Sequence, residues 1–490
     1  MAALGRAERL MDFRILGRGL VAVLMPLTVS ACASFSPDQG MDYVAAIASD
    51  GIDQEIVKVR SDEDARAADQ RVQNLLRRQL SPGDAVQIAL LNNKGLQAAY
   101  NQLAITEAQG INDTLPPSPT LSLARLTAGP SLEIERMILV NVLGLLTLPA
   151  RQEIAERQFL QAQFRAASET LGIALEARRA YYNAVAASQS VTLMRQAKDS
   201  AETASELMKR LGETGAVPKL DQAREHVFYA EITGELARAR QNEEAEREAL
   251  IRVLGLWGDA LKFQLPGSLP PLPANPIRKT DIEREALMRR VDVEMARLEV
   301  AATAEALGLT KATRLVNVLE VAGISNYERE PGEHGGEVEK TKWSGVELEI
   351  QVPVFDFGEA RTRQAKEVYM QAVNRLAEKA VNARSEVREA YQRYRGAYDF
   401  ARHYQNEILP LRQTIAEESL LRYNGMLTDI FPVLADVRAR IASNSAAINA
   451  LRDFWFAHVN LQSALLIGSA PGGGDEAGGT IVAAGGGEAH

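Results

Sequence analysis

Residues 150–187 read ARQEIAERQFLQAQFRAASETLGIALEARRAYYNAVAA, and residues 360–397 read ARTRQAKEVYMQAVNRLAEKAVNARSEVREAYQRYRGA. Identical residues recur at a constant offset of 210 positions (360 minus 150), and the same offset relates Gly215 to Gly425. The offset holds over about 65 residues, which is longer than one unit of a short solenoid repeat. The chain is therefore predicted to contain a duplicated half-domain.

The bulk composition excludes several classes of protein. The chain has 490 residues, a formal net charge of −9 and a pI near 5.4. Binding to nucleic-acid phosphates requires a basic surface, so we expect no nucleic-acid partner. The only cysteine is Cys32, which excludes an internal disulfide framework.

The N-terminus has the parts of a secretory signal. Four arginines between positions 6 and 18 precede an apolar run from Leu20 to Val29. This run is too short to span a bilayer, which takes about 20 residues. The four residues that end at Cys32, VSAC, resemble the lipobox of bacterial lipoproteins, and the resemblance implies that Cys32 is lipidated. The alternatives are an ordinary signal cleavage beside a free cysteine, and a start at Met11.

Two very long helices are predicted, Ala150 to about Leu211 and Glu359 to about Tyr423, each reaching roughly 90 Å. Both are rich in Ala, Glu, Gln, Arg and Leu, which are good helix formers. Pro410 should kink or interrupt the second helix. Each long helix is preceded by a shorter one, and each then reverses at a glycine-bearing turn into a return helix. The expected shorter helices are Ala85 to Gly110 and Asp281 to Gly308, and the return helices are Pro218 to Leu254 and Asp429 to Ile467.

Between the shorter and the long helices the period of the sequence changes to two. From Ser344 to Val354, apolar residues alternate with Glu347, Glu349 and Gln351, which indicates a strand with one apolar and one polar face. Four strands make a poor soluble core, but they suit a share of a barrel with lipid outside and water inside. The other strand candidates are Thr120–Leu126, Leu132–Thr147 and Leu315–Tyr327, and the residues 328–342 are expected to form a solvated external loop.

These features divide the chain into six segments. We predict a mainly α-helical fold with a small β part, in which a β-hairpin and a long-helix hairpin occur twice. The predicted segments are a signal peptide (1–31), a lipid-proximal N-terminal arm (32–81), the first repeat (82–255), a linker (256–280), the second repeat (281–468) and a disordered tail (469–490).

The duplicated order of elements resembles the TolC family of outer-membrane efflux channels. The strand-to-helix junction VPVFDFG at 352–358 and the turns RLGETG at 210–215 and RYNG at 422–425 carry the resemblance, together with Cys32. The first repeat departs from it, with LGLLTLP at 143–149 in place of the junction sequence. The family implies a homotrimer with a twelve-stranded transmembrane β-barrel, an α-helical periplasmic tunnel, a periplasmic adaptor docked at the helical turns and an inner-membrane pump. It also implies a location in the outer membrane, anchored by lipid.

No catalytic constellation is found in the sequence. The five histidines are scattered, no Cys/His pair has metal-ligand spacing, and no glycine-rich phosphate loop occurs. We expect no enzyme activity, no cofactor and no bound metal.

The two turns are the predicted adaptor-docking sites. The alternative is that their glycines and Asn424 serve only a helix reversal that needs positive φ, and that the flanking side chains belong to a solvated last helical turn. The candidate docking residues are Arg210, Leu211, Gly212, Gly215, Arg422, Tyr423, Asn424 and Gly425.

Acidic residues near the turns and on one strand are candidate pore residues. Threefold symmetry would turn each lumen-facing acid near the tips into a ring of carboxylates that attracts cations, although a solvated outer face explains these acids as well. Strand acids should line the lumen, because facing lipid is costly for a charge. The candidates are Glu202, Glu206, Glu417 and Glu418 near the turns, and Glu347 and Glu349 on the strand.

Two functions from different classes follow. The first is the passive exit duct of a tripartite efflux system, and the second is a periplasmic coiled-coil lipoprotein scaffold without a pore. The alternating strand after Ser344 favours the duct. The second turn, with FPVL at 431–434 after it, resembles a branch of the family associated with heavy-metal or copper resistance. The chain has no Met-rich or His-rich tract, so drug or other small-molecule cargo stays open.

Overall fold

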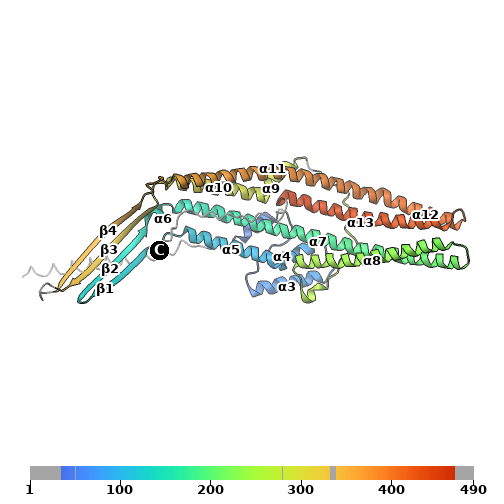
Figure 1. Ribbon diagram of the computed structural model, residues 1–490, viewed down its shortest axis with the longest axis horizontal. Coiled ribbons are helices and arrows are strands. Elements are labelled where there is room, and N and C mark those ends of the chain that lie inside the picture. Colours follow the sequence, from blue (N-terminus) through green and yellow to red (C-terminus); the bar gives the residue numbers. More distant parts are fainter. Residues whose placement is uncertain (1–34, 50, 279, 332–337, 469–490) are drawn as a thin grey trace, which may run out of the picture.

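The computed structural model describes residues 35–49, 51–278, 280–331 and 338–468. The chain is elongated, with a four-stranded sheet at one end and two helical turns at the other (Figure 1). The predicted signal peptide, Cys32 and the tail 469–490 lie outside the described residues, and so does the middle of the predicted external loop.

Helices make up most of the molecule, and the two repeats have matching helix orders except that the short α6 occurs, among the described residues, in the first repeat alone. α2 (Met41–Ala48) and α3 (Asp62–Leu76) precede the first repeat, and a short 3-10 helix, η3 (Gly258–Leu261), follows it. The first repeat contains α4 (Pro82–Asn92), α5 (Lys94–Thr114), α6 (Val142–Leu146), α7 (Leu148–Glu213) and α8 (Lys219–Leu254). The second contains α9 (Ile282–Arg289), α10 (Val291–Ala312), α11 (Glu359–His403), the π-helix η5 (Tyr404–Ile408), α12 (Leu409–Asn424) and α13 (Ile430–Leu466).

Each of the two predicted shorter helices is in fact a pair of helices, so that prediction was wrong. The first pair breaks at Asn93, whose side chain accepts a hydrogen bond from the Leu96 amide and donates one to the Val253 carbonyl. The second breaks at Arg290, which has an extended backbone with ψ 121°. In both cases the break is held by a polar side chain that bonds to a distant part of the chain.

The sheet is antiparallel, with the order β1-β2-β3-β4. Its strands are β1 (Thr120–Ala128), β2 (Ser131–Asn141), β3 (Val318–Glu330) and β4 (Glu339–Gln351). All four expected strands are present, and β2 pairs with β3 to join the two repeats, with Ile134 opposite Tyr327. The prediction that the second strand continues to Thr147 was wrong, because the Asn141 side chain caps α6 by accepting a bond from the Gly144 amide at 2.6 Å.

Among the described residues, no helix covers either face of the sheet (Figure 1). Every residue of β4 is exposed, including the apolar Val346, Leu348 and Ile350. An apolar strand face open to water is unfavourable, at about 25 cal/mol per Å². The described residues therefore leave this apolar strand face without cover.

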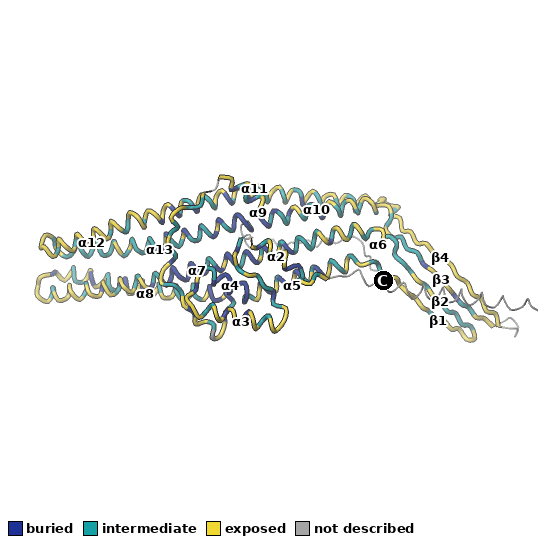
Figure 2. Tube along the Cα trace, turned by 180° about the vertical axis from the view of Figure 1, so that it is seen from behind, coloured by how far each residue is buried: buried dark blue, intermediate teal, exposed yellow. Residues whose placement is uncertain are grey.

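The buried core lies in the middle of the molecule, around α4, α7, α9 and α13 (Figure 2). The stacked rings of Tyr182 and Trp455, 5.1 Å apart, link α7 to α13 there. The predicted N-terminal arm packs on this region, since Met41 and Val44 of α2 are buried. Ser36 fixes the start of the described chain, because its amide donates to Glu107 Oε1 at 2.7 Å.

The two long helices differ in one respect. α7 is continuous over 66 residues, roughly 100 Å, whereas the second long helix is interrupted by the π-helix η5 immediately before Pro410. The predicted interruption near Pro410 is confirmed. A π-helical turn holds one more residue than the α-helical turn it replaces, and this extra residue changes the register of everything that follows.

Candidate functional site at the helical tips

The first tip is a tight reversal between α7 and α8. The Gly215 amide donates to the Gly212 carbonyl at 3.0 Å, and the Ala216 amide donates to the Leu211 carbonyl at 2.9 Å. Gly215 has φ 76°, in the left-handed region where glycine is favoured. These two bonds satisfy carbonyls that the end of α7 leaves without helical partners.

The second tip has the same bonding pattern, shifted by one residue. The Met426 amide donates to the Tyr423 carbonyl at 3.0 Å, and the Leu427 amide donates to the Arg422 carbonyl at 2.9 Å. The residue with left-handed backbone is Met426, at φ 54°, whereas Gly425 has φ −80°. The alternative explanation, in which Gly425 and Asn424 serve a reversal that needs positive φ, was therefore wrong for these two residues, because η5 shifts the turn by one position and Asn424 ends α12.

All eight candidate docking residues lie at the end of the molecule that is opposite the sheet (Figure 1). The second tip is much the more apolar. Leu421, Met426 and Leu427 are 64%, 94% and 80% exposed, whereas the first tip exposes Leu220, at 63%, and Arg210, with a side chain 73% exposed. Sequence reasoning did not single out Met426 and Leu427 as site residues, although two consecutive apolar residues after a helix reversal are a usable signal.

The acids near the tips bond mainly within their own helices. Glu202 pairs with Lys198 at 2.6 Å and Glu206 with Arg210 at 3.0 Å, both one turn away. Glu417 accepts a bond from Gln413 Nε2 at 2.5 Å. Pairs of this kind are typical of a solvated helix face. Which of these acids would face a lumen depends on the arrangement of neighbouring chains, so the pore role stays a prediction.

On the sheet, an acidic face opposes the apolar one. Glu349 lies directly across from Glu320 of β3 in the strand register, and Glu347 lies across from Ala322. Two carboxylates at directly opposed positions repel each other unless water solvates them. Sequence reasoning missed Glu320, because only the pairing of β3 with β4 places it beside Glu349.

The described residues contain no group of three or more His, Cys, Asp and Glu side chains placed to hold a metal ion. None of the helices described combines the length and the apolar character that crossing a membrane requires.

Comparisons with known proteins identify the fold. No protein-family profile and no curated protein matches the sequence. Among solved structures, the transmembrane channel CusC has a TM-score of 0.65 at 15% identity, over 81% of this chain and 92% of that chain. The outer-membrane channel OprN has a TM-score of 0.64 at 17% identity, over 89% and 97%. The outer membrane protein VceC of Vibrio cholerae has a TM-score of 0.62 at 14% identity, over 82% and 97%.

The chain has the fold of an outer-membrane channel. Nearly the full length of each of these channels is matched, so the likeness is not confined to one part of their fold. The resemblance to TolC-type channels that the sequence suggested is thereby confirmed at the level of the fold.

Proposed function

We propose that the protein is the outer-membrane exit duct of a tripartite efflux system. It would act as a passive channel for small molecules or metal ions, driven by an inner-membrane pump through a periplasmic adaptor. The observation that carries this proposal is the sheet, which has one apolar face, one acidic face and no covering layer among the residues that the structure describes. At the far end, both helical hairpins terminate in exposed turns, which suits docking by a separate protein.

A homotrimer completes the sheet. β1 and β4 each pair with only one neighbour in the described chain, so each leaves a row of unpaired backbone groups. An exposed edge of this length invites pairing with another chain. If β4 of one copy pairs with β1 of the next, three copies close a twelve-stranded barrel, with the acids Glu347 and Glu349 toward water and Val346 and Leu348 toward lipid.

The tips would then form six pseudo-equivalent ends of a helical tunnel. The apolar second tip offers the larger surface that a partner could remove from water, at Leu421, Met426 and Leu427. The first tip contributes Arg210 and a backbone turn. We propose both as adaptor-docking surfaces, with acylation of Cys32 anchoring the mature chain in the outer membrane.

A periplasmic scaffold without a pore is the competing function. It gives no reason for a strand in which apolar residues alternate with glutamates on a sheet that lacks cover. The scaffold and the duct differ in their expected cellular location and in the expected mass of the assembly. A heat-resistant trimer in detergent extracts of outer membrane supports the duct, whereas recovery only as a monomer in the soluble periplasm after removal of the lipid overturns it.

Cysteine cross-linking tests the barrel directly. In the proposed trimer, cysteines placed along β1 at Leu123 and along β4 at Val346, Leu348 or Ile350 should join neighbouring chains into oxidised dimers and trimers for at least one pairing. The matched control places cysteines at Ile138 and Gly323, which are partners within one chain. This control pair should cross-link without any increase in mass.

The cargo is tested in a deletion strain challenged with copper, silver and a panel of drugs. Sensitivity to the metals supports the heavy-metal assignment, and sensitivity to drugs alone ends it. Labelling with radioactive palmitate, compared with Cys32→Ser, tests acylation. Equal labelling of both proteins would exclude Cys32 as the lipid site.

A further inference from the structure

The charged side chains of the four strands are separated between the two faces of the sheet. Residues directly opposite each other in an antiparallel register lie on the same face, and successive residues of a strand alternate between faces. On this rule, each lysine and arginine of the strands lies on the face that carries Val346 and Leu348, and each glutamate lies on the other face. We call these cations the basic belt; they are Arg125, Arg136, Arg329, Lys340 and Lys342.

The face that carries the basic belt is the outer one of a curved sheet. The only buried residues of the described strands are Ala322, at 2% exposure, and Asn326, at 6%. Both lie on the glutamate face, since Ala322 is opposite Glu347 and Asn326 is opposite Trp343. Burial on one face alone fits a sheet that curves around that face, so the belt and the apolar residues lie outside.

The belt occupies the end of its face that is farther from the helices (Figure 1). The register places Arg136 in one row across the sheet, Arg125 and Lys342 in the next, and Arg329 and Lys340 in the row after that. The rows of the same face that are nearer the helices contain no charged side chain. An apolar band therefore separates the belt from the helical part of the molecule.

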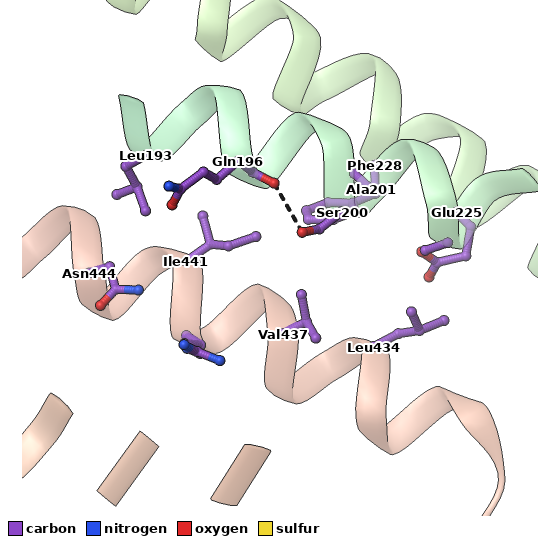
Figure 3. Close-up of a pocket in the computed structure, with 12 residues that line it drawn as sticks. Leu193, Gln196, Ser200, Ala201, Glu225, Phe228, Leu434, Val437, Ile441 and Asn444 are labelled. Atoms are coloured by element: carbon purple, nitrogen blue, oxygen red, sulfur yellow. Dashed lines mark hydrogen bonds between the residues drawn. The ribbon is translucent and has the colours of Figure 1, made fainter. Parts of the chain in front are cut away.

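The belt cations have no acidic partner in the part of the chain that the structure describes. All five are exposed, and only Lys342 lies near a ring, with Nζ 5.8 Å from the centre of the Tyr327 ring. The helical region handles charge differently, because Glu225, which lines a cavity between the two helical hairpins (Figure 3), pairs with Arg438. The charge of the belt is left to be compensated from outside the strands.

Two of the belt cations oppose each other directly. Arg329 lies across from Lys340 in the register, and like charges at such positions repel. Closing a barrel would not supply the missing acid, because the strand of the next copy, β1, contains Arg125 and no acidic residue. An anion that contacts both side chains would turn this repulsion into two favourable interactions.

The length of β4 places the belt at a membrane surface. Val352 ends the apolar alternation directly after β4, and Lys342 lies ten positions earlier (352 minus 342). A rise of about 3.4 Å per residue and a tilt of about 40° give a height of roughly 25 Å between them. This is about the height of the lipid-facing apolar band of a transmembrane barrel. With Val352 at one edge of the band, the belt lies at the other edge, where lipid headgroups begin.

We propose that the basic belt binds the phosphate groups of lipid headgroups in the leaflet that the strand hairpins reach. Phosphate oxygens accept charge-assisted hydrogen bonds from several arginines and lysines at once. The acyl chains of the same lipid would lie against the apolar rows of the face, which a free phosphate ion would leave uncovered. This inference rests on the proposed outer-membrane duct, because it requires the outer face of the sheet to contact lipid.

Titrations of the full-length protein in a neutral, phosphate-free detergent, read by native mass spectrometry, test the belt. The probes are lipid A, the same lipid after removal of its phosphates, and inorganic phosphate. Lipid A should bind to the trimer at least about tenfold more tightly than the dephosphorylated lipid. Added salt should weaken the binding of lipid A more than that of the dephosphorylated lipid, and millimolar inorganic phosphate should not displace lipid A.

Variants locate the binding on the sheet. The double variant Arg329→Gln with Lys340→Gln should bind lipid A about tenfold more weakly, or worse, and should stay trimeric because both positions are exposed. The matched control is Arg224→Gln with Arg238→Gln, which removes the same charge from exposed positions of α8 and should leave binding unchanged. The exchange Arg329→Lys with Lys340→Arg keeps both charges and should retain most of the binding.

The outcomes separate this proposal from the duct itself. Equal binding of both lipids by an intact trimer, or unchanged binding of lipid A by the Gln double variant, would overturn the belt and leave the duct in place. Displacement of lipid A by inorganic phosphate would overturn the assignment to a lipid. A chain that stays monomeric in every detergent would contradict the duct, and with it the lipid-facing surface on which the belt depends.

Discussion

Gly215 and Met426 occupy equivalent positions in the two helical tips. They are 211 positions apart (426 minus 215), and both have left-handed backbone, with φ 76° and 54°. The helix caps that follow, Pro218 and Asp429, show the same separation. The sequence offset of 210 instead pairs Gly215 with Gly425. The π-helix η5 supplies the one additional residue, so both long helices reach their turns with matching geometry despite the insertion.

Deleting Asn406 from η5 should therefore disrupt the second tip. The segment would become α-helical, and α12 would rotate by about 100° relative to α13. The bond from Arg412 Nε to Ser443 Oγ, 3.2 Å long, and the bond between Ser419 and Asp436 should both be lost. Cysteines at positions 419 and 436 should form a disulfide in the otherwise unchanged chain and not in the deletion. Asn406→Ala keeps the residue count and should preserve the cross-link. A cross-link that forms in the deletion as well as in the unchanged chain would mean that η5 does not set the register of α12.

Met426→Gly should separate folding from docking. A left-handed backbone costs a residue with a side chain about 1–2 kcal/mol, so glycine should leave the thermal unfolding midpoint unchanged or slightly raised. If Met426 contacts the adaptor, a deletion strain complemented with Met426→Gly should be less resistant to the exported compounds than one complemented with the unchanged protein. Leu220→Gly in α8 is unsuitable as a control because it weakens a helix; Val227→Ala, at an exposed position, should leave resistance unchanged. Full resistance with Met426→Gly would remove this side chain from the docking surface.

Gly358→Ala should destabilise the protein far more than Gly215→Ala. Both glycines have positive φ, 70° and 76°. A Cβ at Gly358 would lie 2.2 Å from the Arg314 carbonyl oxygen, whereas one at Gly215 would meet nothing within 4 Å. We expect a loss of about 1 kcal/mol for Gly215→Ala from the backbone alone, and at least about 3 kcal/mol for Gly358→Ala, measured by unfolding. Similar losses would show that the junction at Gly358 relaxes freely.

The sequence was sufficient for the parts of the fold that depend on local patterns. Helix-forming composition from Ala150 to about Leu211 predicted α7, which has 66 residues, and strict alternation predicted β4. The helix breaks could not be found in this way. Asn93 bonds to Val253, 160 positions away, and Arg290 bonds to Glu386, 96 positions away. Such partners become visible only when the fold brings them together.

The tips show the same limit. The sequence located both turns to within one or two residues, because glycine and a change of helical pattern mark them. It could not place the left-handed residue of the second turn, since η5 (Tyr404–Ile408) has no composition that distinguishes it from an α-helix.

Arg290→Met should be strongly destabilising. The Arg290 side chain is 3% exposed and pairs with Asp292 at 2.8 Å and with Glu386 at 2.6 Å. Removing one member of a buried ion pair costs about 3–5 kcal/mol, because the partner charges lose their compensation. Arg297→Met is the matched control, since its pair with Glu294 is solvent-exposed and is worth less than about 1 kcal/mol. Chemical unfolding should separate the two variants clearly, and equal losses would contradict a structural role for the pair.

His458 should make the stability of the molecule depend on pH. Its ring lies among Tyr394, Phe454 and Trp455, at centroid distances of 5.8, 6.4 and 5.7 Å. Burial, together with the positive charge of Arg178, lowers the pKa of His458 from 6.5 to about 4. The unfolded chain therefore takes up a proton at a pH where the folded chain does not. The stability associated with neutral His458 is complete above pH 6.5 and is lost as the pH falls toward 4.

The size of this effect follows from the shift. The difference between the unfolded and folded pKa values of His458 corresponds to about 3 kcal/mol in the free energy of unfolding, which changes by about 1.4 kcal/mol per pH unit inside the window. His458→Phe should reduce the pH dependence of the free energy of unfolding across this window by the amount that corresponds to the uptake of one proton. Phe454→Leu, which changes the same cluster without removing a titrating group, should lower stability and leave the slope as it is. An unchanged slope in His458→Phe would show that this histidine titrates alike in the folded and unfolded chains.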